Sequence, residues 1–288
     1  MRMLLGAALL AIGGGARAQL PGGCGFDVAT LTYAGTPREQ AACLLRPVAR
    51  WGEVASRPAR LPAALAAIVG EPMDEGHALG QYLAARRVDE ADIGGALAGK
   101  LSQANDGDAA ATTARYFVIH DTSWPDLGNA RRFPANKSAA LNQLGNYAGP
   151  DAVAHVFVNR RGETLLGHDF GVPWRATKFE NDLLGLAGKG LYLHVELVQP
   201  RRRDRSRKGK NDALAPSPGF TAAQYDKLAL LYAAASARGG MWLVPAFHAT
   251  VDEGIPEAHD DPQNFELRKF AEAVGSLRKT LRKRESKD

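Results

Sequence analysis

The sequence predicts an α/β protein with a mixed central β-sheet flanked by helices and a small, mainly helical N-terminal segment. Three short apolar runs rich in β-branched and aromatic residues predict buried strands: "RYFVIH" (115–120), "LYLHVELV" (191–198) and "MWLVPAFH" (241–248). A strong helical pattern lies between the second run and the third. Strands with intervening helical segments are typical of a mixed α/β sheet.

Two strand predictions carry further detail. In "LYLHVELV" leucine and valine side chains occupy one face, while the other face holds Tyr192, His194 and Glu196. The segment "AHVFVNRRGETLLG" (154–167) predicts a hairpin whose turn runs from Asn159 to Gly162.

The clearest helix prediction covers "FTAAQYDKLALLYAAASARGG" (220–240). Thr221 and Gln224 have the spacing of a capping box, in which each side chain accepts a hydrogen bond from a free backbone N–H group. Gly239 and Gly240 are typical of a helix end, because glycine adopts the left-handed conformation at low cost.

Changes in pattern divide the chain into four parts. Residues 61–103 repeat apolar side chains every three or four positions, and "ANDGDAAATTA" (104–114) interrupts that period. We therefore expect a signal peptide (1–18), an N-terminal accessory segment (19–110), the sheet-containing domain (111–275) and a basic tail (276–288).

The first residues resemble a secretory signal. Arg2 supplies the positive start, residues 4–12 the apolar run, and Ala16-Arg17-Ala18 the small-x-small cleavage pattern. The alternatives are a buried helix, which the cleavage pattern disfavours, and a membrane anchor, for which the run is too short. No later segment is apolar enough to cross a membrane, so we expect an exported protein, periplasmic or extracellular.

The cysteine content fits that compartment. Cys24 and Cys43 are the chain's two cysteines, and an even count in an exported chain suggests one disulfide. Two unpaired thiols are the alternative. Neither cysteine lies near the histidine-rich stretches, which argues against metal ligation by them.

The chain is basic, with 36 Lys and Arg against 31 Asp and Glu and a net charge of +5. This excess suits surface attraction to anionic envelope polymers. Much of it lies in "RRRDRSRKGK" (201–210) and in the C-terminal tail, and neither run has interleaved aromatics, so we expect no nucleic-acid binding. A solvated loop and a frayed tail are the favoured explanation of the two runs.

Histidines and acidic residues near the predicted strand ends suggest a metal site. His120 and His248 each end an apolar strand, and Asp261 follows on a loop that can fold back over them. Two imidazoles and one carboxylate with an open fourth position form the catalytic arrangement of Zn²⁺. Glu196, an acidic residue on an otherwise apolar strand, is the candidate general base.

Each of these residues also has a simpler explanation. A histidine at a strand end is commonly a hydrogen-bonded core or rim residue. Glu196 could pair with an arginine, and Asp260-Asp261-Pro262 could form a turn in which an aspartate caps backbone amides.

The order of motifs resembles the type 2 family of zinc-dependent N-acetylmuramoyl-L-alanine amidases, which includes the peptidoglycan recognition proteins and the phage lysozyme-amidases. The resemblance runs from about Tyr116 to Phe265 and is carried by "FVIHDTS", "AHVFVNRRGE", "VPW", "HVELV", "FTAAQYDKLALL", "PAFHAT" and "HDDPQNF". It implies zinc ligation by His120, His248 and Asp261, and it places the base on Glu196.

The resemblance also implies substrate contacts, and the chain departs from the family at two of them. His259 stands where members usually carry a lysine, and would stabilise negative charge only when protonated. Arg175 replaces a histidine that often follows the position of Trp174; its guanidinium could grip a stem-peptide carboxylate or form a surface salt bridge. His155, before the hairpin, would lie beside the site as a substrate contact or help to shape it.

The implied reaction is hydrolysis of the amide between N-acetylmuramic acid and L-alanine in peptidoglycan or muropeptide fragments. Zinc would polarise the carbonyl, and Glu196 would move the proton. Alternatives are a non-catalytic peptidoglycan-binding module, a zinc peptidase acting within the stem peptide, and a protein whose N-terminal segment docks to a partner while the sheet is a scaffold. The complete ligand set favours an enzyme.

Overall fold

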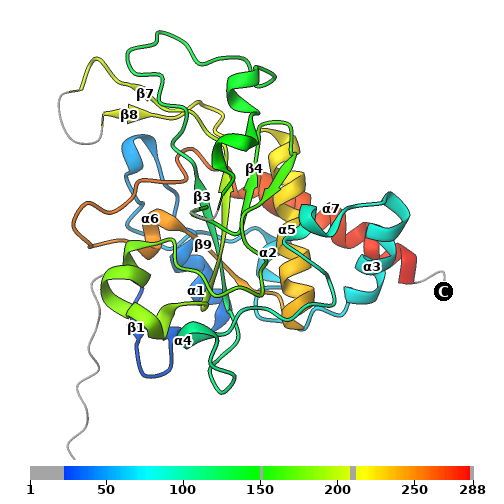
Figure 1. The fold of residues 1–288 in the computed structure, drawn as a ribbon. Helices are drawn as coiled ribbons and strands as arrows, with labels where there is room; N and C mark the ends of the chain where they lie inside the picture. Colours follow the sequence, from blue (N-terminus) through cyan, green and yellow to red (C-terminus); the bar gives the residue numbers. More distant parts are fainter. Residues whose placement is uncertain (1–22, 150–151, 208–211, 286–288) are drawn as a thin grey trace, which may run out of the picture.

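The computed structural model describes residues 23–149, 152–207 and 212–285, so the predicted signal peptide lies outside the described residues. The predicted α/β class is confirmed: a five-stranded mixed sheet with the order β5-β4-β6-β3-β9 lies among helices (Figure 1). None of the described helices is long and apolar enough to span a membrane.

The central sheet contains the three predicted strands and the hairpin. Its strands are β3 (Tyr116–Asp121), β4 (Val156–Val158), β5 (Thr164–Leu166), β6 (Tyr192–Leu197) and β9 (Val244–Phe247). β6 and β9 pair with β3 in parallel, β4 pairs with β6 in parallel, and β5 closes the edge antiparallel to β4. The carboxyl ends of β3, β6 and β9 therefore meet at one edge of the sheet.

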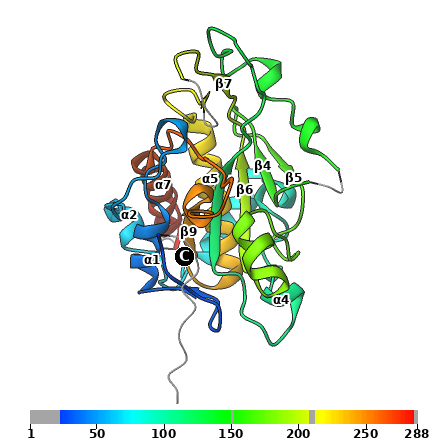
Figure 2. The ribbon, with the colours of Figure 1, turned by 90° about the vertical axis from the view of Figure 1, so that its left-hand side faces the viewer.

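Helices cover both sides of the sheet. Figure 2 shows α7 and α2 on one side of the strands and α4 on the other. The helices are α1 (Pro37–Leu44), α2 (Ala63–Ala66), α3 (Gly76–Arg86), α4 (Ala104–Gly107), α5 (Ala222–Gly239), α6 (His248–Val251) and α7 (Leu267–Glu285). Two small ribbons, β1–β2 (Phe26–Asp27, Thr32–Tyr33) and β7–β8 (Arg202–Arg203, Ala213–Leu214), lie outside the main sheet.

Single helical turns connect these elements. They are the 3₁₀ turns η1 (Arg50–Gly52), η2 (Glu90–Ile93), η3 (Ala139–Leu141), η4 (Leu144–Tyr147) and η6 (Gly185–Gly188), and the π-helix η5 (Phe179–Leu184). A π-helical turn is rare and is often found at functional sites. Here η5 begins next to the candidate site described below.

The predicted ends of α5 and of the hairpin turn are confirmed. Thr221 caps α5, with the reciprocal hydrogen bonds to Gln224 of a capping box, and Gly240 ends it in the left-handed conformation. In the hairpin, Asn159 Oδ1 accepts the backbone N–H of Glu163 at 3.0 Å. Gly162 has a φ of +79°, and a Cβ there would lie 2.7 Å from the carbonyl oxygen of Ala223, so the turn requires glycine.

The N-terminal segment shares one hydrophobic core with the sheet, so the predicted boundary near residue 110 does not separate two cores. Tyr33 packs edge to face on Tyr116 of β3 at 5.1 Å, and the Tyr33 N–H donates to the Tyr116 hydroxyl at 3.0 Å. Phe26 packs on Phe179 at 5.1 Å. Aromatic pairs of this geometry add stability beyond the apolar area they bury.

The interpretation of the C-terminal residues as a frayed tail is wrong for the described part. α7 continues to Glu285, and Leu281 on it is fully buried. The buried carboxylate of Glu75 lies 2.7 Å from Arg278 and 2.9 Å from Arg282. The helix persists because it has an apolar face to bury and a buried anion to pair with.

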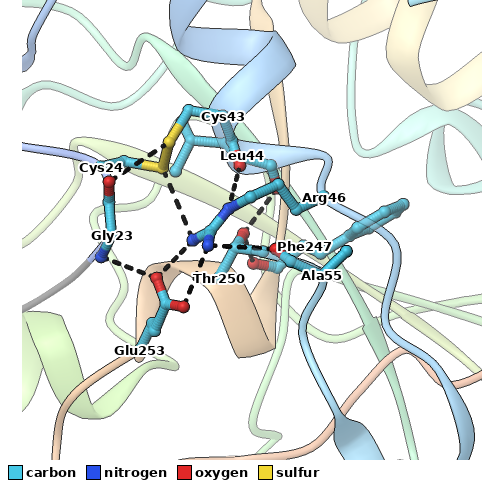
Figure 3. Close-up of a disulfide and its surroundings, with 9 residues drawn as sticks. All are labelled: Gly23, Cys24, Cys43, Leu44, Arg46, Ala55, Phe247, Thr250 and Glu253. Atoms are coloured by element: carbon cyan, nitrogen blue, oxygen red, sulfur yellow. Dashed lines mark hydrogen bonds and ion pairs between the residues drawn. A yellow bond between two sulfur atoms is a disulfide. The ribbon is translucent and has the colours of Figure 1, made fainter. Parts of the chain in front are cut away.

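The predicted disulfide is present, with the Cα atoms of Cys24 and Cys43 5.9 Å apart (Figure 3). Beside it, Arg46 pairs with Glu253, and Glu253 also accepts the N–H of Gly23 at 2.6 Å. The bond and this ion pair tie the first described residues to α1 and to the loop after α6, next to the strand ends.

We expect the double variant Cys24→Ser/Cys43→Ser to lose about 3 kcal/mol of unfolding free energy, because the loop-entropy model assigns that value to a loop of this length. Urea denaturation measures it. Wild-type protein treated with a reductant serves as the control and should unfold at the same urea concentration as the variant. An unchanged midpoint in both samples would contradict a stabilising role for the bond.

Candidate metal centre

Parallel strand pairing brings the two candidate histidine ligands together. His120 is near the end of β3, and His248 is the first residue after β9, its parallel neighbour. On the other side of β3, His120 lies directly opposite Glu196 of β6 in the sheet register. Residues side by side on parallel strands point to the same face of the sheet, so all three side chains converge at one edge.

The ligand atoms lie at distances that suit one cation. His120 Nδ1 lies 2.9 Å from His248 Nδ1, and His248 Nδ1 lies 3.0 Å from Asp261 Oδ1. His120 Nδ1 and Asp261 Oδ2 are 4.0 Å apart. In a tetrahedral zinc site with bonds of about 2.0 Å, neighbouring ligand atoms lie about 3.3 Å apart. All three side chains are buried, and together they form a cluster that could hold a metal ion.

The electrostatics of this cluster favour a bound cation. Burial, and then the neighbouring His248, hold the pKa of His120 well below its usual value, so His120 is a neutral imidazole able to donate a lone pair. Burial also lowers the pKa of His248, but Asp261 and Asp252 outweigh it and raise that pKa well above normal. The carboxylates that favour a positive charge on His248 would favour a bound metal cation in the same way.

Glu196 is placed as expected for a base beside the cluster. Its Oε1 atom lies 3.9 Å from His120 Nδ1, and its buried Oε2 atom has no hydrogen-bond partner among the described residues. Burial, and then the Asp261 carboxylate, raise the pKa of Glu196 well above its usual value. A carboxyl group with a free oxygen and a raised pKa is suited to accepting and returning a proton.

Asp261 is held by a second aspartate and a buried arginine. Its Oδ2 atom accepts the backbone N–H of Asp121 at 2.9 Å, and Asp121 Oδ2 lies 2.7 Å from Arg201. The N–H of Gln263 donates to the same Asp121 oxygen at 3.1 Å. Arg201 is almost fully buried, so the interpretation of 201–210 as a solvated loop is wrong for this residue.

His248 has its own outer carboxylate, which it shares with His259. Asp252 Oδ2 lies 3.0 Å from His248 Nε2 and 3.2 Å from His259 Nδ1. The two rings stack at 4.3 Å with 26° between their planes. A nitrogen of each ring therefore faces the same Asp252 oxygen, and these three residues form a second, partly exposed group that could hold a metal ion.

His259 is half exposed, with 51% of its side chain accessible to solvent. Asp252 engages its Nδ1 atom, and stacking on His248 fixes the plane of the ring. Its Nε2 atom has no partner among the described residues, so it can face a substrate at the edge of the cluster.

Of the two roles predicted for His155, a substrate contact does not fit its environment, whereas a role in shaping the site does. His155 is fully buried; its Nε2 lies 3.1 Å from the carbonyl oxygen of Val172, and its Nδ1 accepts the N–H of His194 at 3.0 Å. Both ring nitrogens are engaged by backbone groups of the fold. His155 therefore supports β6 behind the site and has no free atom for a substrate.

Trp174 and Arg175 lie outside the cluster. The Trp174 ring stacks on His168 at 3.9 Å, and its indole N–H donates to the carbonyl of Val153 at 3.2 Å. Arg175 is half buried and has no hydrogen bond or ion pair within the part of the chain that the structure describes. Neither contacts a candidate ligand there, so their roles as substrate contacts stay predictions.

Five further residues at the site were absent from the predicted set: Asp121, Tyr147, Glu180, Arg201 and Asp252. Tyr147 lies near Glu196. Burial raises the pKa of Tyr147, a hydrogen bond with Thr122 lowers it, and the Glu196 carboxylate raises it further. Their sequence signals are weak, because all but Asp121 lie outside the central strands. Asp121 directly follows His120 and could have been found from that position.

No family model, curated protein or solved structure matches the chain. His120, His248 and Asp261 form a buried cluster compatible with a metal ion.

Proposed function

We propose that the protein is a zinc-dependent amidase that cleaves the bond between N-acetylmuramic acid and L-alanine in peptidoglycan or its fragments. The supporting observation is the convergence of His120, His248 and Asp261, with the free carboxylate oxygen of Glu196 beside them. Two imidazoles and one carboxylate with room for a further ligand are typical of catalytic zinc. The choice of substrate rests on the resemblance of the motif series.

In this proposal His120 and His248 would hold the ion through Nδ1, and Asp261 would hold it through a carboxylate oxygen. Zinc would supply Lewis-acid polarisation of the scissile carbonyl and would lower the pKa of water. Glu196 accepts a proton from the attacking water and returns it to the leaving nitrogen, so the carboxylate is regenerated at the end of each turnover.

His259 stabilises the negative charge that develops on the carbonyl oxygen. The contact with Asp252 orients its ring and favours the N–H tautomer that faces this carboxylate. Only a protonated ring presents an N–H group on the exposed side, so the stabilising role requires the imidazolium form.

We further propose that the protein works after export, in the periplasm or outside the cell. The Cys24–Cys43 disulfide supports an oxidising compartment. The net charge of +5 supports attraction to anionic polymers of the envelope.

Purified muropeptides test the reaction directly. We expect mass spectrometry to detect intact stem peptides with a free L-alanine amine, together with the peptide-free muramyl sugar. A chelator should stop the release, and added zinc should restore it. Fragments cut within the peptide would instead indicate a zinc peptidase, and binding of muropeptides without any product would indicate a recognition module.

A further inference from the structure

A chain of three buried side chains leads away from the candidate metal centre. The Nε2 atom of His120, on the far side of the ring from the ligand cluster, lies 3.0 Å from Nδ1 of His194. His194 Nε2 lies 3.2 Å from Oε2 of Glu180. His194 and Glu180 are both completely buried. The second contact is mainly electrostatic, because its angle departs from that of a regular hydrogen bond.

The ring protons of His120 and His194 have one arrangement that is consistent with these contacts. If Nδ1 of His120 binds a metal, the ring proton must lie on Nε2, which then donates to Nδ1 of His194. His194 therefore carries its own proton on Nε2, which faces the Glu180 carboxylate. Each ring is held in the tautomer that leaves Nδ1 of His120 free for the ion.

Glu180 is anchored by the turn that precedes η5. Its Oε2 atom accepts the N–H of Ala176 at 3.2 Å, and both the N–H and the hydroxyl of Thr177 at 3.1 and 3.0 Å. The same turn holds the other outer carboxylate, because the N–H groups of Lys178 and Phe179 donate to Asp252 at 3.2 and 2.9 Å. Residues 176–180 thus position the carboxylates behind both histidine ligands.

Packing alone does not explain well why Glu180 and His194 are buried as a pair. In the described part of the chain, Glu180 forms no ion pair with lysine or arginine, and His194 is the only ionisable partner that it contacts. Burying a carboxylate and an imidazole is costly, and apolar side chains of similar volume would fill the space with less penalty. The pair is therefore better explained by a task at His120 than by packing.

We propose that His194 and Glu180 are positioning residues that hold His120 in the tautomer and orientation required for metal binding. The inference rests on the proposed role of His120 as a ligand. Outer-shell partners of this kind typically contribute about 10–100-fold to metal affinity.

The test is the zinc dissociation constant, measured by competition with a chromophoric chelator. We expect His194→Leu, which removes both nitrogens, to weaken zinc binding by about 10–100-fold. His194→Gln should recover most of the affinity, because its amide offers one acceptor and one donor. Glu180→Gln keeps the oxygen that Ala176 and Thr177 bind but loses the charge, and should fall between His194→Leu and the wild type.

Two further measurements separate positioning from folding. Tyr232→Phe removes the buried hydrogen bond to the carbonyl of Leu243, away from the site, and should lower the melting temperature without changing zinc affinity. The visible spectrum of cobalt-loaded protein should change in His194→Leu and stay unchanged in Tyr232→Phe, because only the former removes the partner that orients the ligand His120.

The outcomes distinguish failure of the positioning role from failure of the proposed metal centre. Zinc affinity within about threefold of the wild type in both His194→Leu and Glu180→Gln would overturn the positioning role, even if the wild type binds zinc and cleaves muropeptides. A wild-type protein that binds no divalent ion would overturn both the metal centre and this inference. If His194→Leu does not fold, Glu180→Gln and His194→Gln decide the question.

Discussion

Glu196→Gln is expected to lower amide hydrolysis by about 10²–10⁴-fold, the usual contribution of a general acid–base group. Glutamine has the shape of glutamate but cannot take up the proton of the attacking water. Since the Glu196 side chain is not one of the three proposed ligands, the variant should retain zinc. Stem-peptide release measured by mass spectrometry and zinc content measured by elemental analysis test the two halves of this prediction.

Glu163→Gln is the matched control, because Glu163 lies in the hairpin turn of the same sheet and bonds to Asn159, away from the cluster. We expect this variant to turn over muropeptides at nearly the wild-type rate. Wild-type turnover by Glu196→Gln would remove that residue from the mechanism. Loss of zinc from Glu196→Gln would instead make the carboxylate a ligand.

The strands and their ends were predictable because their signals are local. Alternation in "LYLHVELV" placed Glu196 and His194 on one face, and the capping box at Thr221 located the start of α5. The adjacency of β3 and β9 is different, because 128 residues separate His120 from His248. Their parallel pairing depends on packing across the whole sheet, which local periodicity does not encode.

The supporting residues could not be predicted for related reasons. Arg201 belongs to a basic run whose average character indicates solvent, yet its own side chain turns inward to Asp121. Glu180 lies in the short π-helix η5, whose sequence has no clear periodicity, and its contact with His194 becomes visible only when β6 places that residue beside it. The N-terminal segment is helical by pattern, but nothing local indicates that Tyr33 packs on Tyr116.

Asp261→Asn is expected to weaken zinc binding by more than about 100-fold, the upper end for an outer-shell partner, because it removes the only negative charge among the three ligands. Asparagine retains an oxygen that can accept the N–H of Asp121, so the local fold should persist. Amidase activity should fall in parallel, and excess zinc should restore part of it. Metal competition assays and muropeptide turnover measure both effects.

Asp260→Asn provides a sharp control because it changes the same chemical group one residue away. Asp260 accepts the side-chain N–H of Gln263 at 2.6 Å and lies 3.9 Å from Arg201, so its carboxylate contacts the network that holds Asp261 without joining the cluster. Its replacement should leave zinc affinity within a few fold of the wild type. If Asp260→Asn loses the metal while Asp261→Asn keeps it, the ligand assignment on this loop is wrong. If both variants keep it, the loop supplies no carboxylate ligand, and the assignment of Asp261 to the metal centre is wrong.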